Sequence, residues 1–340
     1  MKTIKGSSPF IFNKPVKGKQ FLNYKSELEE VYSKLQDPAL VFVMGYSGMG
    51  KTSFVRELVS LINKRDKSRV VVFVSLKKCK SEFEVILKYV IAVANAFDHK
   101  IKLKTLNSKL LIHWMALVSF PDKLAEKKKK KVTLILDDFD VISGMPSQRT
   151  LEGILRFPWD DQEWISTCVC IKQTHDMINF YGARKRPFYD TGTIITLKGV
   201  QPGNFYGYIL ACFKNNNQSI RKDAIMYLMS KMNGIPKYIQ NLAHHIYLTA
   251  VAEITIDVID SVIEDIVRSY SPSYRKKFNT LTILQKRVLA GYANDKPVDV
   301  ASRYLLKTYT AVESIVTIWT DRPYFLDPYF GYYLKKKTEV

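Results

Sequence analysis

Runs of apolar residues divide the chain into strand-like and helix-like segments. Short continuous apolar runs predict five β-strands, at residues 40–44, 70–74, 132–136, 167–171 and 193–197. Continuous rather than alternating apolar runs are typical of parallel strands that helices cover on both faces. Helical periodicity appears between them, at residues 52–64, 83–97 and 108–117. The pattern therefore predicts the α/β class, with a doubly wound, parallel five-stranded sheet.

After residue 197 the strand pattern stops and the chain reads as helical. Helices are expected at residues 204–213, 223–232, 236–251 and 256–270. Further helices at 281–292, 298–307 and 310–318, followed by a hairpin within 319–325, predict a winged helix-turn-helix. We therefore expect four parts: an N-terminal segment and helix at 1–36, a sheet domain at 37–200, a helical domain at 201–270 and a winged-helix domain at 271–340.

The net charge of the chain indicates which classes of partner it favours. Lys and Arg number 52 against 32 Asp and Glu, which gives a formal net charge of +20. Such an excess favours acidic partners, among them DNA, another polyanion, an anionic membrane or an acidic protein. A lysine-rich proteome or a hot habitat would produce the same excess. The four cysteines show no metal-ligand spacing, which favours a reducing, cytoplasmic compartment, and no apolar run approaches the ~20 residues of a membrane span.

Candidate chemistry begins where the first strand meets the following helix. This segment matches the Walker A phosphate-loop pattern at every fixed position, with Gly45, Tyr46, Ser47, Gly48, Met49, Gly50, Lys51 and Thr52. The glycines allow backbone N–H groups to wrap a phosphate, and the helix start adds its partial positive charge. Lys51 is expected to reach the β- and γ-phosphates and Thr52 to bind Mg²⁺, with Ser53 also in the nucleotide site.

The third strand ends in two acidic residues, Asp137 and Asp138. A strand buried on both faces is not expected to end in adjacent carboxylates without a chemical reason. We expect Asp137 to hold Mg²⁺ through water, and Asp138 to orient and deprotonate an attacking water. The alternative is a solvated pair at the start of a loop.

Three further positions are candidates for contacts with a nucleotide. A polar residue at the end of the fourth strand, Gln173 or Thr174, could sense a γ-phosphate, and we select Thr174. The basic stretch before the fifth strand offers Arg186 for the charge of the transition state, unless that stretch is a solvated loop. Pro236, in a Gly-Ile-Pro turn between helices, could pack on a nucleotide base, although such a turn needs no function.

These motifs together resemble the archaeal ATPase group of P-loop proteins, which is related to the AAA+ and STAND ATPases. The resemblance covers nearly the whole chain. Its landmarks are Gly18-Lys19-Gln20-Phe21, Glu27-Leu28, the phosphate loop, Leu136-Asp137-Asp138, Gly234 with Pro236 and Tyr238, and Asp327-Pro328-Tyr329-Phe330. The chain departs from the family at Thr191, where the family often has Arg, and at Asp138, where many members have Glu.

The resemblance implies an ATPase that binds ATP and Mg²⁺ and turns over slowly. It also implies that the helical domain is a lid whose Gly-x-Pro turn senses the nucleotide, so that ATP switches a hinge. The partner stays open between DNA and a protein, and a nucleotide-dependent homo-oligomer is a further expectation. The start of the expected recognition helix offers Thr308, Thr310 and Glu313 rather than base-reading side chains, so basic residues elsewhere would contact phosphates without specificity. The alternatives are a signalling module without DNA binding and, less well supported, a small-molecule phosphotransferase.

Overall fold

The computed structural model describes residues 7–101, 111–200, 202–296, 316–318 and 323–338. The chain forms two compact units. The sheet unit comprises Lys17–Tyr46 and Lys51–Lys198, and the helical unit comprises Met1–Val16, Ser47–Gly50 and Gly199–Val340. The four-part division expected from the sequence stays a prediction. In the described parts of the chain, no helix is long and apolar enough to cross a membrane.

The sheet unit is built on a five-stranded parallel sheet with the order β2-β3-β4-β1-β5. Its strands are β1 (Leu40–Gly45), β2 (Val70–Ser75), β3 (Val132–Asp137), β4 (Ile165–Lys172) and β5 (Thr193–Thr196). The predicted fold class is therefore confirmed. Because all strands run in one direction, the ends of β1, β3 and β4 lie at one edge, where ligands bind in sheets of this kind.

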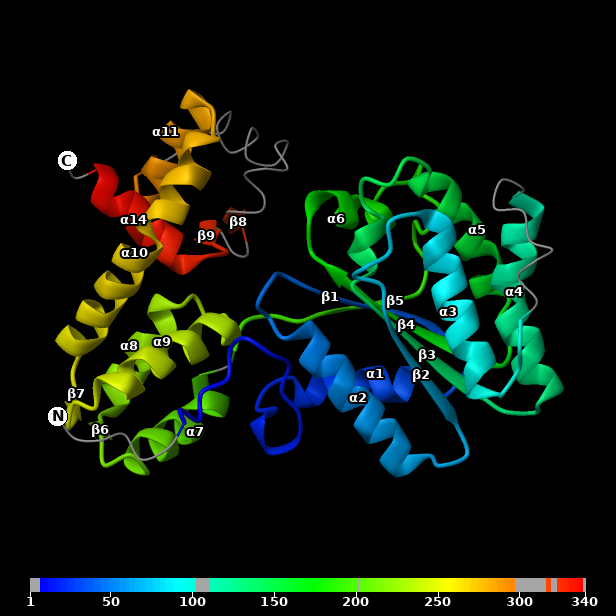
Figure 1. Cartoon of the computed structure of the whole chain (residues 1–340), viewed down its shortest axis with the longest axis horizontal. Helices are drawn as coiled ribbons and strands as arrows, with labels where there is room; N and C mark the ends of the chain where they lie inside the picture. Colours follow the sequence, from blue (N-terminus) through cyan, green and yellow to red (C-terminus); the bar gives the residue numbers. More distant parts are fainter. Residues whose placement is uncertain (1–6, 102–110, 201, 297–315, 319–322, 339–340) are drawn as a thin grey trace. The chain divides into compact units, whose positions relative to one another are not determined.

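Helices cover both faces of the sheet (Figure 1). Alternation along β1 decides which side chain faces which layer. Val41 and Val43 face α1 (Lys25–Lys34) and α2 (Lys51–Arg65), whereas Phe42 and Met44 face the opposite layer. That layer comprises α3 (Glu82–Ala96), α4 (Leu111–Lys127), α5 (Gln148–Asp160) and α6 (His175–Gly182). Each large apolar side chain fully buried in these layers contributes about 1.5–3 kcal/mol, so the sheet is a rigid platform for the residues at its edge.

The helical unit contains most of the remaining helices. They are α7 (Pro202–Lys214), α8 (Lys222–Lys231), α9 (Pro236–Thr249), α10 (Ile256–Asn279), α11 (Ile283–Ala293) and α14 (Pro328–Thr338). Strands do not stop at residue 197 as expected, because β6 (Ser219–Ile220) and β7 (Glu253–Ile254) form a short parallel pair. Phe10 of the N-terminal segment is buried against rings of α7 and α9, which ties this segment to the helical unit.

The C-terminal part differs from the expected winged helix at several points: α10 continues to Asn279, beyond the expected end at 270, and α14 follows the hairpin, where no helix was expected. The expected helix at 310–318 is wrong at its end, because β-branched residues place Val316–Ile318 in strand β8, paired antiparallel with β9 (Pro323–Phe325). The rest of that helix and the one expected at 298–307 lie outside the described residues. The Asp-Pro-x-Phe landmark starts α14, where the Tyr274 hydroxyl of α10 donates to the two Asp327 carboxylate oxygens at 3.1 and 3.3 Å. The landmark thus joins α14 to α10.

Candidate nucleotide site

The phosphate loop links β1 to α2, and its lysine hydrogen-bonds to backbone carbonyls at the start of the loop. Gly48 and Gly50 have φ angles of 86° and 87°, a left-handed conformation that favours glycine and turns successive N–H groups inward. Lys51 is the first residue of α2, and its Nζ donates to the carbonyl oxygens of Gly45 at 2.8 Å and Tyr46 at 3.1 Å. Burial lowers the pKa of Lys51, and nearby carboxylates oppose that shift. Lys51 and the two carbonyls that it contacts therefore lie together in the sheet unit, and binding of a phosphate by the loop stays a prediction.

The end of β3 brings an acidic group to this loop. Asp137 is 2% exposed and hydrogen-bonds with the Thr52 side chain, one residue after the loop lysine. Burial raises the pKa of Asp137, the neighbouring Asp138 raises it further, and the Thr52 hydrogen bond opposes both. The two residues predicted to share a metal therefore meet in the structure, although they are 85 positions apart (137 − 52).

Asp138 sits beyond the strand in a left-handed conformation, with φ 61°, which aspartate tolerates better than most residues. Its carboxylate is held by Ser75, whose Oγ donates to Oδ2 at 2.8 Å. Ser75 ends β2, in register with Asp137 on β3. Sequence reasoning missed Ser75. A hydroxyl residue at the end of an otherwise apolar strand was the available signal, but only the strand order shows that it lies beside the acidic pair.

The end of β4 contributes Gln173 and Thr174, which the structure separates in role. The backbone N–H of Gln173 donates to the Gly45 carbonyl at 3.0 Å, so this residue lies directly beside the start of the loop. The Thr174 hydroxyl caps α6 by accepting from Met177 N at 3.3 Å. Asp140 accepts from Lys172 N at 2.9 Å and fixes the end of β4 against the segment after β3.

The model of an ATPase domain found predominantly in Archaea matches residues 21–242, which include the phosphate loop and the acidic pair. The chain belongs to this ATPase family. No curated protein gives a significant match.

Solved structures share the fold of this archaeal-type ATPase at low sequence identity. The Walker-type ATPase of Pyrococcus abyssi has a TM-score of 0.66 at 11% identity, covering 96% of this chain and 99% of that one. The Aeropyrum pernix ORC2 protein in ADPNP–ADP complexes has a TM-score of 0.59 at 13% identity, covering 97% and 98%. The Aeropyrum pernix ORC1 protein in complex with DNA has a TM-score of 0.53 at 13% identity, covering 84% and 76%. At these identities the likeness shows the fold alone.

Arg186 of this ATPase has a partner that the sequence did not suggest. Its guanidinium donates to both Glu152 carboxylate oxygens, at 2.9 and 2.5 Å, and the two side chains are 9% and 0% exposed. A second arginine, Arg156, holds the same loop through Pro187 O at 2.6 Å and through the Thr191 hydroxyl. The geometry therefore favours a structural role for Arg186 in placing the segment before β5.

The Gly-Ile-Pro turn lies in the helical unit of the ATPase. Gly234 has φ 66° and its carbonyl accepts from Val200 N at 2.8 Å, while Pro236 is the first residue of α9. Lys237 N donates at 3.2 Å to the carbonyl of Gly48, which belongs to the same unit. A contact between Pro236 and a nucleotide base stays a prediction.

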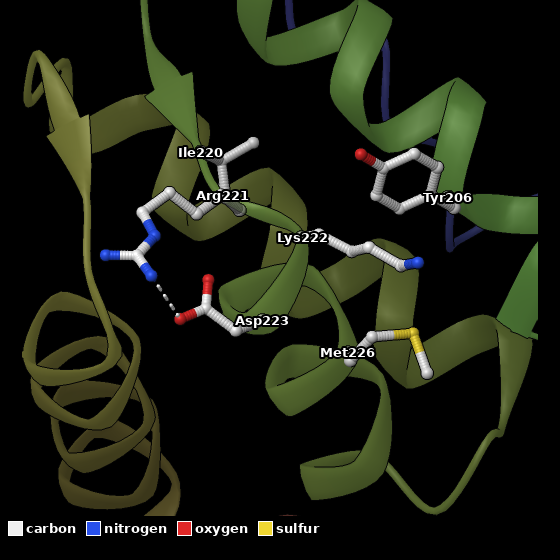
Figure 2. Close-up of a pocket in the computed structure, with 6 residues that line it drawn as sticks. All are labelled: Tyr206, Ile220, Arg221, Lys222, Asp223 and Met226. Carbon is white, nitrogen blue, oxygen red and sulfur yellow. Dashed lines mark ion pairs between the residues drawn. The ribbon is translucent and has the colours of Figure 1, made fainter.

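An open depression of about 710 Å³ lies elsewhere in the helical unit, between α7 and the start of α8 (Figure 2). Its lining residues are Tyr206, Ile220, Arg221, Lys222, Asp223 and Met226. Arg221 is already paired with Asp223 at 3.2 Å. None of these residues belongs to the phosphate loop or the acidic pair, so the depression has no part in the chemistry described above.

Proposed function

We propose that this ATPase binds Mg·ATP at the phosphate loop and hydrolyses it with Asp138 as the residue that orients the attacking water. The observation that carries the proposal is the meeting of four groups from two segments: Lys51 and Thr52 at the loop, Asp137 and Asp138 at the end of β3. This combination of a cation, a hydroxyl and two carboxylates is the one that phosphoryl transfer to water requires.

The residues present fit a magnesium ion. The Thr52 hydroxyl and the Asp137 carboxylate are hard oxygen donors already joined by a hydrogen bond. Among the described residues there is no group of three or more His, Cys, Asp or Glu side chains that could hold a metal alone. Mg²⁺ suits such a sparse site because it usually keeps waters and takes its other ligands from phosphates. When bound, it would neutralise charge on the β- and γ-phosphate oxygens.

The other side chains have separable roles in the proposed reaction. The Lys51 ammonium, now held by two backbone carbonyls, would turn to the β- and γ-phosphates. The Asp138 carboxylate would accept the proton of the attacking water, and Ser75 would keep that carboxylate in place. Gln173 and Thr174 are both proposed near the γ-phosphate, with Gln173 favoured because it adjoins the loop and the Thr174 hydroxyl already caps α6.

We also propose slow turnover and association with nucleic acid. Aspartate at position 138 is one methylene shorter than glutamate, so its carboxylate lies farther from the attacking water than a glutamate carboxylate would. The net charge of +20 supports a polyanionic partner. The structural neighbour ORC1 was solved with DNA, which agrees with this proposal for a chain of the same fold.

Two variants test the site, and one control accompanies them. Lys51→Ala should abolish or strongly weaken Mg·ATP binding by calorimetry, whereas Lys64→Ala at the other end of α2 should bind as the wild type does. Asp138→Asn should still bind Mg·ATP but lose hydrolysis by about 10²- to 10⁴-fold, the usual contribution of a general base. Normal hydrolysis by both site variants would refute the proposed function.

The nucleic-acid part of the proposal needs its own measurement. The ATPase rate of the full chain is compared with and without DNA, and DNA binding is titrated across salt. A rate that responds to DNA, together with binding that weakens as salt rises, supports association with nucleic acid. Hydrolysis that ignores DNA, with no DNA binding at low salt, would instead favour a signalling or protein-interaction module.

A further inference from the structure

The amino ends of β2 and β3 bring two lysine-rich segments together. Val70 and Val132 are register partners at the start of these strands, and Val70 N donates to Lys131 O at 2.9 Å. The segment before β2 follows α2, and the segment before β3 follows α4, so the C-terminal ends of both helices lie at this edge (lower right in Figure 1). With strands of six residues, this amino edge lies about 20 Å from the edge that carries the acidic pair.

A buried arginine fixes the end of a third helix at the same edge. Arg69, immediately before β2, is 7% exposed. Its guanidinium donates to Leu35 O at 2.8 Å and to Gln36 O at 2.7 Å, directly after α1. The ends of α1, α2 and α4 are therefore held beside one another by the sheet and by Arg69.

These three helix ends carry a cluster of exposed lysines, here called the amino-edge lysines. They are Lys34, Lys64, Lys67, Lys127, Lys128, Lys129, Lys130 and Lys131. Within the described residues, the one ion pair they form joins Lys131 to Asp37 at 4.0 Å. Acidic side chains share this edge: Glu29 and Asp66 are paired with arginines, and Glu126, next to Lys127, is exposed. Asp161 and Glu163 lie before β4, where the basic surface ends.

One of these lysines occupies a backbone position that favours glycine. Lys129, the second residue after the end of α4, has φ 52°, and the backbone N–H of its neighbour Lys130 donates back to Ala125 O at 3.1 Å. Helices that end in this way usually have glycine at the left-handed residue, because a side chain there is strained.

We propose that the amino-edge lysines bind the phosphate backbone of duplex nucleic acid without sequence preference. The inference rests on the nucleic-acid part of the proposed function and gives it a surface. The lysine ammonium is a single charge on a flexible side chain, whereas the arginine guanidinium is a planar group that can form paired hydrogen bonds. A surface of lysines therefore neutralises phosphates but does not read bases. The surface lies at the opposite edge of the sheet from the nucleotide site, which leaves both accessible to their ligands.

A lipid surface fits this edge less well. Interfacial membrane binding combines basic residues with exposed apolar side chains that insert among the lipids. Among the described residues, none of the exposed large apolar side chains falls within 61–69 or 121–131. The phosphate backbone of a nucleic acid is therefore a better match than a membrane for these segments, which offer charge without exposed large apolar side chains.

A triple variant tests the surface in the full chain. Lys127→Gln/Lys128→Gln/Lys130→Gln is compared with the wild type for binding to a short duplex DNA of arbitrary sequence across salt. The logarithm of the binding constant against the logarithm of salt should lose about 2 to 3 units of slope, close to one for each phosphate contact removed. Lys286→Gln/Lys335→Gln/Lys337→Gln in the helical unit removes the same charge and should leave most of the slope in place. Urea unfolding checks that each variant is folded.

A single variant separates binding from stability. Lys129→Gly relieves the left-handed strain, so its midpoint of urea unfolding should rise while its salt slope falls by about one unit. A structural role alone predicts no change in DNA binding.

The outcomes distinguish failure of the amino-edge inference from failure of the proposed association with nucleic acid. Full binding and an unchanged slope in the amino-edge variant would overturn this inference and leave the nucleic-acid proposal intact. No DNA binding by the wild type at low salt would overturn both. Binding to phosphatidylserine vesicles that the triple variant loses, without binding to DNA, would assign the edge to a lipid surface and also overturn the inference.

Discussion

The buried pair between Glu152 and Arg186 allows the sharpest test of how the sheet unit is held together. Both carboxylate oxygens of Glu152 are bonded to one guanidinium, and neither side chain has appreciable contact with water. Removal of one partner from such a pair destabilises a fold by about 3–5 kcal/mol, because it leaves a buried charge without compensation. Glu152→Gln keeps one acceptor, so we expect the lower end, about 3 kcal/mol.

The prediction is measured by urea unfolding followed by tryptophan fluorescence. Three of the four tryptophans, Trp114, Trp159 and Trp164, belong to the sheet unit, so most of the signal reports on the unit that contains the pair. The control is Glu29→Gln, which breaks a pair whose side chains are 53% and 42% exposed and should change stability far less. Equal unfolding midpoints for the two variants would show that the pair is not buried as described.

A double variant then decides the role of Arg186. Glu152→Leu/Arg186→Met replaces the ion pair with apolar groups, which is often neutral or stabilising. If Arg186 acts only on structure, the double variant should hydrolyse ATP at a rate close to that of the wild type. A loss of 10³-fold or more in a folded double variant would instead identify Arg186 as the arginine that stabilises the transition state, as the sequence suggested.

Three further outcomes follow from particular contacts. Ser75→Ala should lower the ATPase rate by about tenfold with little effect on calorimetric ATP binding, because it frees the Asp138 carboxylate but leaves the loop unchanged. Burial raises the pKa of Asp327, so above about pH 4 the folded state retains a proton that the unfolded state has lost. The wild type therefore loses stability as pH rises above about 4, and Asp327→Asn should gain stability relative to it. A difference in urea midpoints that stays constant with pH would refute this. Gly192 has a φ of 70°, and Gly192→Ala would place a methyl group 2.6 Å from a backbone oxygen of β1. This variant should lower the free energy of unfolding, measured in urea, by about 1–3 kcal/mol or more. Gly182→Ala, with open space around the added methyl group, should leave it unchanged.

The chemistry of the site could be predicted wherever it depends on adjacent residues. The phosphate loop needs glycines, a lysine and a hydroxyl at fixed spacing, so its pattern alone gives its conformation. The five strands were also predictable, because strands buried on both faces are uniformly apolar. Ser75 could not be placed in this way, since nothing along the chain shows that β2 lies beside β3 in register.

Charged residues were the least predictable. Arg186 follows two other basic residues in a loop, which is typical of a solvated or catalytic stretch, yet it is inside the sheet unit. Its partner Glu152 lies 34 positions earlier, on a helix, α5, that the apolar pattern did not predict. The sequence shows the sign of a charge but not its burial, and burial depends on tertiary packing.

A structural effect, the helix dipole, explains some of the amino-edge lysines but not all of them. A helix C-terminus carries partial negative charge, so a lysine or arginine in the last turn contributes about 0.3–1 kcal/mol. Lys64 and Arg65 occupy the last turn of α2, and Lys127 that of α4.

The dipole effect ends within that turn, and Lys128 to Lys131 follow beyond it. Adjacent like charges on this surface repel one another, and among the described residues the one ion pair that offsets this repulsion joins Lys131 to Asp37 at 4.0 Å. Their repulsion would be relieved by a ligand that carries regularly spaced negative charge. Helix capping therefore accounts for the lysines of the last turns, and the run beyond α4 is the part that a bound phosphate backbone explains.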